Sequence, residues 1–60
     1  MKNLAKLRKE RGLSQTAFAA ALRTSQANVS QWENGHIQPR PNTITRIAKA
    51  LKVREIELVL

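Results

Sequence analysis

Apolar residues recur every three or four positions along most of this 60-residue chain, and that spacing places them on one face of an α-helix. Four segments carry the pattern, and glycine, proline or small polar residues separate them. The predicted helices span residues 2–11, 15–22, 26–34 and 41–51. Their expected inward side chains are Leu4, Leu7, Phe18, Ala19, Leu22, Val29, Trp32, Ile44, Ile47, Ala48 and Leu51.

The residues at the segment boundaries suit helix ends. Ser14 and Ser25 precede the second and third segments, where a hydroxyl can accept a hydrogen bond from an unpaired backbone N–H group. Gly12 and Gly35 follow the first and third segments and suit the left-handed conformation that ends many helices. Pro41 suits the first helical position, where a missing N–H group costs nothing.

The tail from residue 53 to residue 60 fits two structures. Ile56, Val59 and Leu60 share one face of a short helix, whereas Ile56, Leu58 and Leu60 alternate as in a strand. We expect a short fifth helix, and a dimerising β-strand over residues 54–60 is the alternative. Ile56, Val59 and Leu60 then either cover the core or contact a second copy of the chain.

The fold class expected from these patterns is all-α. A compact bundle of about five short helices would form one domain over residues 1–60, with a helix-turn-helix at its centre. A chain of this length buries only about 60% of the surface of its unfolded form, so its stability rests on one small core.

The charge of the chain points to a polyanionic partner. Eleven Lys and Arg residues against four acidic residues give a net charge of +7. Such a surplus is typical of nucleic-acid binders, and it also suits an anionic membrane surface. No apolar run approaches the ~20 residues of a spanning helix, and the first residues lack the apolar segment of a signal peptide. A cytoplasmic location is therefore expected.

Catalysis and cofactor binding are not expected. The chain has no cysteine and one histidine, His36, which excludes a disulfide or a thiolate metal site. Ser14, Ser25 and Ser30 are present, but nothing places a base and an orienting acid around them. We expect no enzyme, no cofactor and no small-molecule substrate.

The second and third predicted helices are joined by three residues, which suggests a helix-turn-helix. In that motif the first helix crosses the DNA backbone, and the start of the second helix enters the major groove. The segments LRKERGLSQ, VSQWENG and IAKALKV resemble the lambda-repressor-like Xre/Cro class of bacterial and phage regulators. The resemblance spans nearly the whole chain. It implies a bundle of about five helices that binds double-stranded operator DNA as a two-fold homodimer.

The resemblance assigns base reading to the third predicted helix. The amide of Gln26 can donate and accept together, which matches N6 and N7 of adenine. Ala27 offers a methyl group suited to the methyl group of thymine. The base-reading positions of the family fall here on Gln26, Ala27, Ser30 and Gln31.

The resemblance also assigns phosphate contacts, which position a protein without reading the sequence. Gln15 matches a phosphate contact that in phage repressors also braces the next glutamine, here Gln26. Asn34 matches another, although Asn followed by Gly is equally typical of a helix-ending turn. The full set of phosphate candidates is Gln15, Asn34, Arg40, Thr24 and His36.

An acid beside DNA is repelled by phosphate unless it is paired, and the family pairs Glu33 with an arginine of the first helix. That arginine is Arg8 here, so we expect an Arg8–Glu33 ion pair. The chain departs from the family where glycine is usual, with Arg23 and Lys52, and where serine caps are usual, with Arg40 and Arg54. All four departures add positive charge, which suggests that stability was exchanged for phosphate affinity.

The function predicted from the sequence is a sequence-specific DNA-binding transcriptional regulator, a phage or bacterial repressor of a palindromic operator. One alternative is an antitoxin-type regulator that also binds a toxin protein. Another is a basic helical module for RNA or a membrane surface. The apolar stripes lie on several short helices, which favours a closed core over lipid binding. The only aromatic residues, Phe18 and Trp32, are spaced for that core, which disfavours RNA stacking.

Overall fold

The computed structural model describes residues 1–59, and this part of the chain is helical throughout, without a strand. Its elements, in chain order, are α1 (Leu4–Glu10), α2 (Gln15–Leu22), α3 (Gln26–Asn34), α4 (Pro41–Leu51) and a single 3₁₀ turn, η1 (Glu55–Leu58). The all-α prediction is confirmed. The alternative of a strand over residues 54–60 is wrong for its described part, and Leu60 lies outside the described residues.

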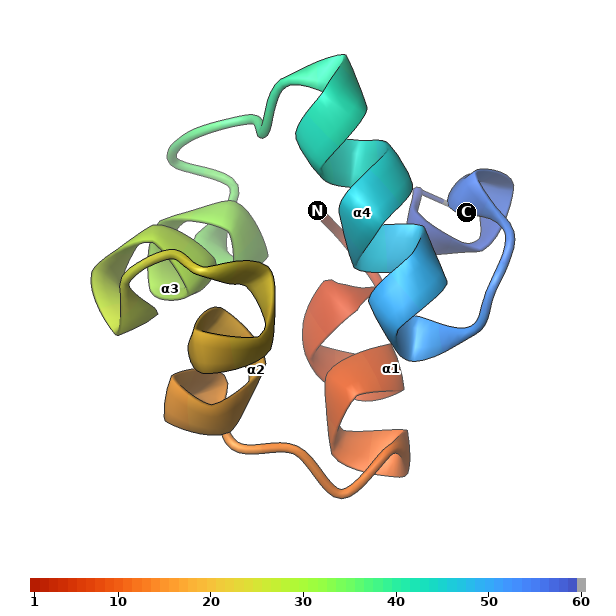
Figure 1. The fold of residues 1–60 in the computed structure, drawn as a ribbon. Helices are drawn as coiled ribbons and strands as arrows, with labels where there is room; N and C mark the ends of the chain where they lie inside the picture. Colours follow the sequence, from red (N-terminus) through yellow and green to blue (C-terminus); the bar gives the residue numbers. More distant parts are fainter. Residues whose placement is uncertain (60) are drawn as a thin grey trace.

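The helices surround one apolar core (Figure 1). The paired helices α2 and α3 lie on one side, α4 lies across from them, and η1 packs against α4. Nine of the eleven side chains expected to point inward are buried, and Leu7 and Ile44 pack against the core while partly exposed. Met1 and Leu58 also belong to the core. The apolar pattern did not single out Met1, and it included Leu58 only in the strand alternative.

Both serine caps form as expected. Ser14 Oγ accepts the N–H of Ala17 at 3.0 Å, and Ser25 Oγ accepts the N–H of Asn28 at 3.1 Å. Each bond satisfies one backbone donor that the first helical turn leaves unpaired. The two caps therefore fix where α2 and α3 begin, and the cap at Ser25 also sets one end of the turn between the two helices.

Two helices end on a left-handed residue that is not glycine. Arg23 follows α2 and Lys52 follows α4, each with φ of 58°. This conformation costs an L-residue about 1–2 kcal/mol, because the Cβ approaches a carbonyl oxygen. Both turns keep their closing bonds, with Thr24 N–H donating to Ala19 O at 2.9 Å and Val53 N–H donating to Ala48 O at 3.0 Å. The sequence therefore places strain at both positions where the family usually has glycine.

The tail differs in detail from the expected helical face. The turn η1 buries Leu58 completely and leaves Ile56 50% and Val59 53% exposed. A 3₁₀ turn has three residues per turn rather than 3.6, which changes the residues that face inward. Glu57 accepts the N–H of Arg54 at 2.8 Å and so starts the turn where the family has a serine cap. Ile56 and Val59 therefore do not cover the core.

Candidate nucleic-acid interface

The outer face of α3 carries the four residues expected to read bases. Gln26 and Ala27 are exposed, and Ser30 and Gln31 are partly exposed. Residues four positions apart on a helix are neighbours, so Gln26 lies beside Ser30 and Ala27 lies beside Gln31. The opposite face of α3 holds Val29 and Trp32 in the core. The structure therefore brings the four candidates together on one accessible surface.

A buried ion pair joins α1 to α3. Arg8 Nε lies 2.6 Å from Glu33 Oε2, and Arg8 Nη2 donates to Glu33 Oε1 at 3.3 Å. The two side chains are only 7% and 6% exposed. Arg8 also donates through Nη1 to the carbonyl oxygen of Leu13 at 2.7 Å. The guanidinium thus holds α3 and the segment between α1 and α2 at once.

The environment of Glu33 favours its ionised form. Burial alone would raise the pKa of this carboxyl group, but hydrogen bonds from Arg8 and Gln15 lower it. The positive charges of Arg8 and Lys9 lower the pKa further, so the pKa of Glu33 lies below the ordinary value of 4.5. Glu33 is therefore a carboxylate at neutral pH, which can only accept hydrogen bonds.

Two glutamine amides extend this ion pair to the surface. Gln15 Nε2 donates to Glu33 Oε1 at 2.8 Å, and Gln26 Nε2 donates to Gln15 Oε1 at 2.6 Å. Gln15 opens α2 and Gln26 opens α3, so the two helix starts are tied by their side chains. Arg8, Glu33, Gln15 and Gln26 form one continuous network, which we call the amide relay.

The phosphate candidates other than Gln15 lie in different settings. Thr24 accepts a hydrogen bond from Asn28 Nδ2 at 2.9 Å, so its hydroxyl lies at the N-terminal end of α3. Asn34 Nδ2 lies 3.5 Å from the hydroxyl of Ser30, on the exposed side of the helix. His36 and Arg40 are exposed in the loop between α3 and α4.

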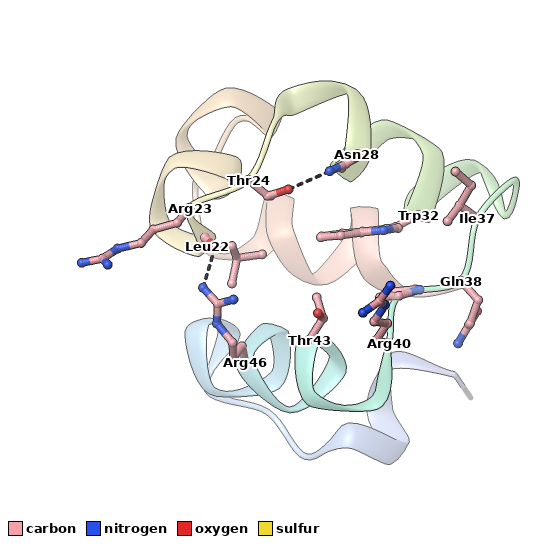
Figure 2. A pocket seen from close by; sticks show the side chains of 11 residues that line it. Leu22, Arg23, Thr24, Asn28, Trp32, Ile37, Gln38, Arg40, Thr43 and Arg46 are labelled. Carbon is pink, nitrogen blue, oxygen red and sulfur yellow. Dashed lines mark hydrogen bonds between the residues drawn. The ribbon is translucent and has the colours of Figure 1, made fainter.

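A cationic cleft of about 330 Å³ lies beside α3 (Figure 2). It is bounded by the end of α2, the flank of α3, the loop and the start of α4. Arg46 Nη2 donates to the carbonyl oxygen of Leu22 at 2.5 Å and so closes one wall. Among the described residues no carboxylate lines the cleft. Its lining residues are Leu22, Arg23, Thr24, Asn28, Trp32, Ile37, Gln38, Pro39, Arg40, Thr43 and Arg46.

The cleft brings together two expected residues, Thr24 and Arg40, but not Asn34 or His36. Sequence reasoning missed Asn28, Thr43 and Arg46 as members of this surface. Asn28 and Arg46 lie on polar helix faces like other solvated residues, and only the packing of α4 against α2 brings them to one cleft. No spacing in the sequence indicates that packing.

Within residues 1–59 no helix is long and apolar enough to cross a membrane. No group of three or more His, Cys, Asp or Glu side chains there could hold a metal ion.

Two capped helices, the second with an accessible polar face, define a helix-turn-helix DNA-binding domain. The helix-turn-helix family model matches residues 4–58, and the chain belongs to this family of DNA-binding transcriptional regulators, in its Xre type. The chain is 40% identical over 57 residues to the uncharacterized HTH-type transcriptional regulator y4dJ of Sinorhizobium fredii (strain NBRC 101917 / NGR234). That alignment covers 95% of this chain and 74% of the relative. No solved structure matches the chain significantly.

Proposed function

We propose that this protein is a repressor that binds a palindromic operator as a homodimer, with α3 in the major groove. The accessible row of small and amide side chains on α3 is the observation that supports this function most directly. The major groove is about 12 Å wide and admits one α-helix. The start of α3, where Gln26 and Ala27 are exposed, is the part that would meet the base edges.

The side chains of α3 suit different bases. Gln26 can form a bidentate pair with adenine, and Ala27 can pack on a thymine methyl group. Ser30 and Gln31 follow on the same face, where a hydroxyl and an amide can contact several bases. These four residues would supply the sequence preference of the protein.

The surfaces on the two flanks of α3 suit phosphate. Arg23 and Arg40 line the cleft on the α4 side, and Arg46 adds charge to its wall. On the α2 side Gln15 opens the helix and is partly exposed. A helix that lies in the major groove has a sugar-phosphate strand on each side, so both flanks can contact the backbone at once. Thr24, Asn34 and His36 are further candidates.

The tail supplies a surface for a second copy. Ile56 and Val59 are both about half exposed, next to the buried Leu58. Burying such side chains stabilises an interface, and two copies related by a two-fold axis would bury both pairs. Leu60 lies outside the described residues. In a bacterial or phage-infected cell this dimer would act in the cytoplasm, where the DNA lies.

Selection of bound duplexes from random DNA tests the proposal. We expect an inverted repeat whose half-sites lie about 10 base pairs apart, or a multiple of that, centre to centre. Analytical ultracentrifugation with the selected duplex should give two protein chains per duplex. Equal affinity for selected and random duplexes would exclude sequence-specific repression.

A further inference from the structure

We propose that Glu33 is a positioning residue that makes α3 prefer adenine over guanine, because its carboxylate fixes the amide of Gln15, which in turn fixes that of Gln26. The inference rests on the proposed function, and it assigns a specificity role to a residue that is buried away from the DNA. Glu33 would contact no base, and it would act only through the amide relay.

The first step of the relay is the polarity of Gln15. Glu33 Oε1 can only accept a hydrogen bond, and the group 2.8 Å from it is Gln15 Nε2. If the amide of Gln15 were reversed, its oxygen would face a carboxylate oxygen with no proton between them. The carboxylate therefore holds Gln15 with its NH₂ group inward and its oxygen outward.

The second step transfers that polarity to Gln26. The outward oxygen of Gln15 accepts from Gln26 Nε2 at 2.6 Å, so this nitrogen is turned toward Gln15. One N–H of Gln26 is used in that bond. The other N–H and the amide oxygen remain for DNA, and Gln26 therefore presents one donor and one acceptor.

One donor and one acceptor match adenine and not guanine. Adenine offers the N7 acceptor and the N6 donor in the major groove, whereas guanine offers two acceptors, N7 and O6. A reversed Gln26 would accept from Gln15 and would keep both N–H groups for the base. That arrangement matches guanine. The direction of the relay thus decides which purine is favoured.

Glu33→Gln should reverse the relay. Arg8 donates to both carboxylate oxygens, from Nε to Oε2 at 2.6 Å and from Nη2 to Oε1 at 3.3 Å. The amide oxygen of the variant should take the place of Oε2, because the shorter of these two contacts needs an acceptor there. The NH₂ group of the new amide then faces Gln15, which must present its oxygen inward. Gln15 in turn donates to Gln26, and Gln26 presents both N–H groups to the base.

The experiment measures base preference with the full chain. Duplexes carrying adenine or guanine at the position read by Gln26 are compared for wild type and Glu33→Gln. A good bidentate pair discriminates roughly 5- to 150-fold, and we expect the adenine-to-guanine affinity ratio to fall at least about ten-fold in the variant. Positions read by Ser30 and Gln31 should keep their preference. An unchanged ratio in a folded variant would overturn the inference.

Glu57→Gln is the matched control, because it makes the same change of charge outside the relay. Glu57 is partly buried and accepts the N–H of Arg54. This variant should keep the adenine preference. If it lowers the ratio as much as Glu33→Gln does, the effect is one of charge and the relay is excluded.

A second variant covers the case in which Glu33→Gln does not fold. Gln15→Leu leaves the buried ion pair intact and removes the link to Gln26, whose amide can then take either orientation. We expect the adenine-to-guanine ratio to approach one while the thermal unfolding midpoint stays close to wild type. Retained adenine preference in this variant would refute the relay.

Failure of the inference and failure of the proposed function give different results. If the wild-type protein binds all duplexes equally, it has no base preference that Glu33 could influence, and the proposed function itself fails. A wild-type protein that selects adenine, together with variants that still select it, leaves the function standing and rejects the relay alone.

Discussion

Replacing Arg23 and Lys52 by glycine, one at a time, should distinguish the effect of backbone strain on stability from the effect of side-chain charge on DNA binding. Both residues have φ of 58°, and both stand where the family usually has glycine. Only Arg23 lines the cationic cleft. Lys52 follows α4 and does not line the cleft; it lies six residues beyond Arg46, the cleft residue nearest to it along the helix, which is about 9 Å at a rise of 1.5 Å per residue.

Both replacements should stabilise the fold by similar amounts. Glycine removes the left-handed penalty of about 1–2 kcal/mol, and its greater freedom in the unfolded chain offsets about 0.4–1 kcal/mol of that gain. The net gain should be about 0.5–1 kcal/mol. For a domain of this size such a gain raises the midpoint of thermal unfolding by about 2–8 °C, which circular dichroism can follow.

The effects on DNA binding should differ. Losing one phosphate contact lowers the slope of log K against log salt by about one, and only Arg23→Gly should show this change. Fluorescence anisotropy from 50 to 300 mM salt measures the slope. If Lys52→Gly flattens the slope equally, the cleft is not the phosphate surface. If both variants are less stable than wild type, the left-handed residues are not strained.

The remaining predictions concern the ion pair and the DNA surface. Glu33→Ala should lower the free energy of unfolding, measured by chemical denaturation, by about 3–5 kcal/mol because it leaves Arg8 buried without its partner. Arg8→Met combined with Glu33→Leu should lower it by less than that single change. An equal or larger loss of stability in the double variant would contradict this. The pKa of Glu33 is lower in the folded chain than its ordinary 4.5, so the stability that the ionised carboxylate gives the fold is complete above pH 4.5 and is lost as pH falls through the lower folded pKa. In urea titrations at pH 7 and pH 3, the free energy of unfolding should therefore fall less between the two pH values for Glu33→Gln than for wild type. Gln26→Ala should narrow the gap between operator and random DNA by about 1–3 kcal/mol, and equal weakening on both would show that Gln26 reads no base. Arg40→Ala should weaken binding to both DNAs alike and lower the salt slope by about one, and a loss confined to operator would place Arg40 on a base.

The sequence predicted the bounds of α2, α3 and α4 because each start is marked locally by a serine cap or a proline. Gly35 marks the end of α3, whereas α2 and α4 end at the last apolar residue of their stripes, since Arg23 and Lys52 carry no sequence signal for the left-handed conformation that they adopt. The first helix has no such cap at its start, since Asn3 makes no side-chain cap bond. It was predicted over residues 2–11 and is observed as Leu4–Glu10. Local signals therefore set the accuracy of each boundary.

The candidate site was less accessible to sequence reasoning. The Arg8–Glu33 contact and the Gln15–Gln26 contact were expected from the resemblance, and the structure places both pairs in contact. The bond from Gln15 to Glu33 that joins the two pairs was not expected, because it depends on how closely α2 and α3 pack. The cleft was not expected for the same reason. Contacts between helices depend on tertiary packing that a single sequence does not mark.

Three arginines of this basic chain are tied to backbone carbonyl groups within the fold. Arg46 donates to Leu22, Arg11 donates to Leu51 at 2.8 Å, and Arg8 donates to Leu13. The carbonyls of Leu22 and Leu51 close the C-terminal ends of α2 and α4, where a helix has partial negative charge. Arg8 and Arg11 are held by these bonds away from the cleft, whereas Arg46 keeps its charge in the cleft wall. The salt dependence of DNA binding should therefore follow the few cations that face phosphate and not the net charge of +7.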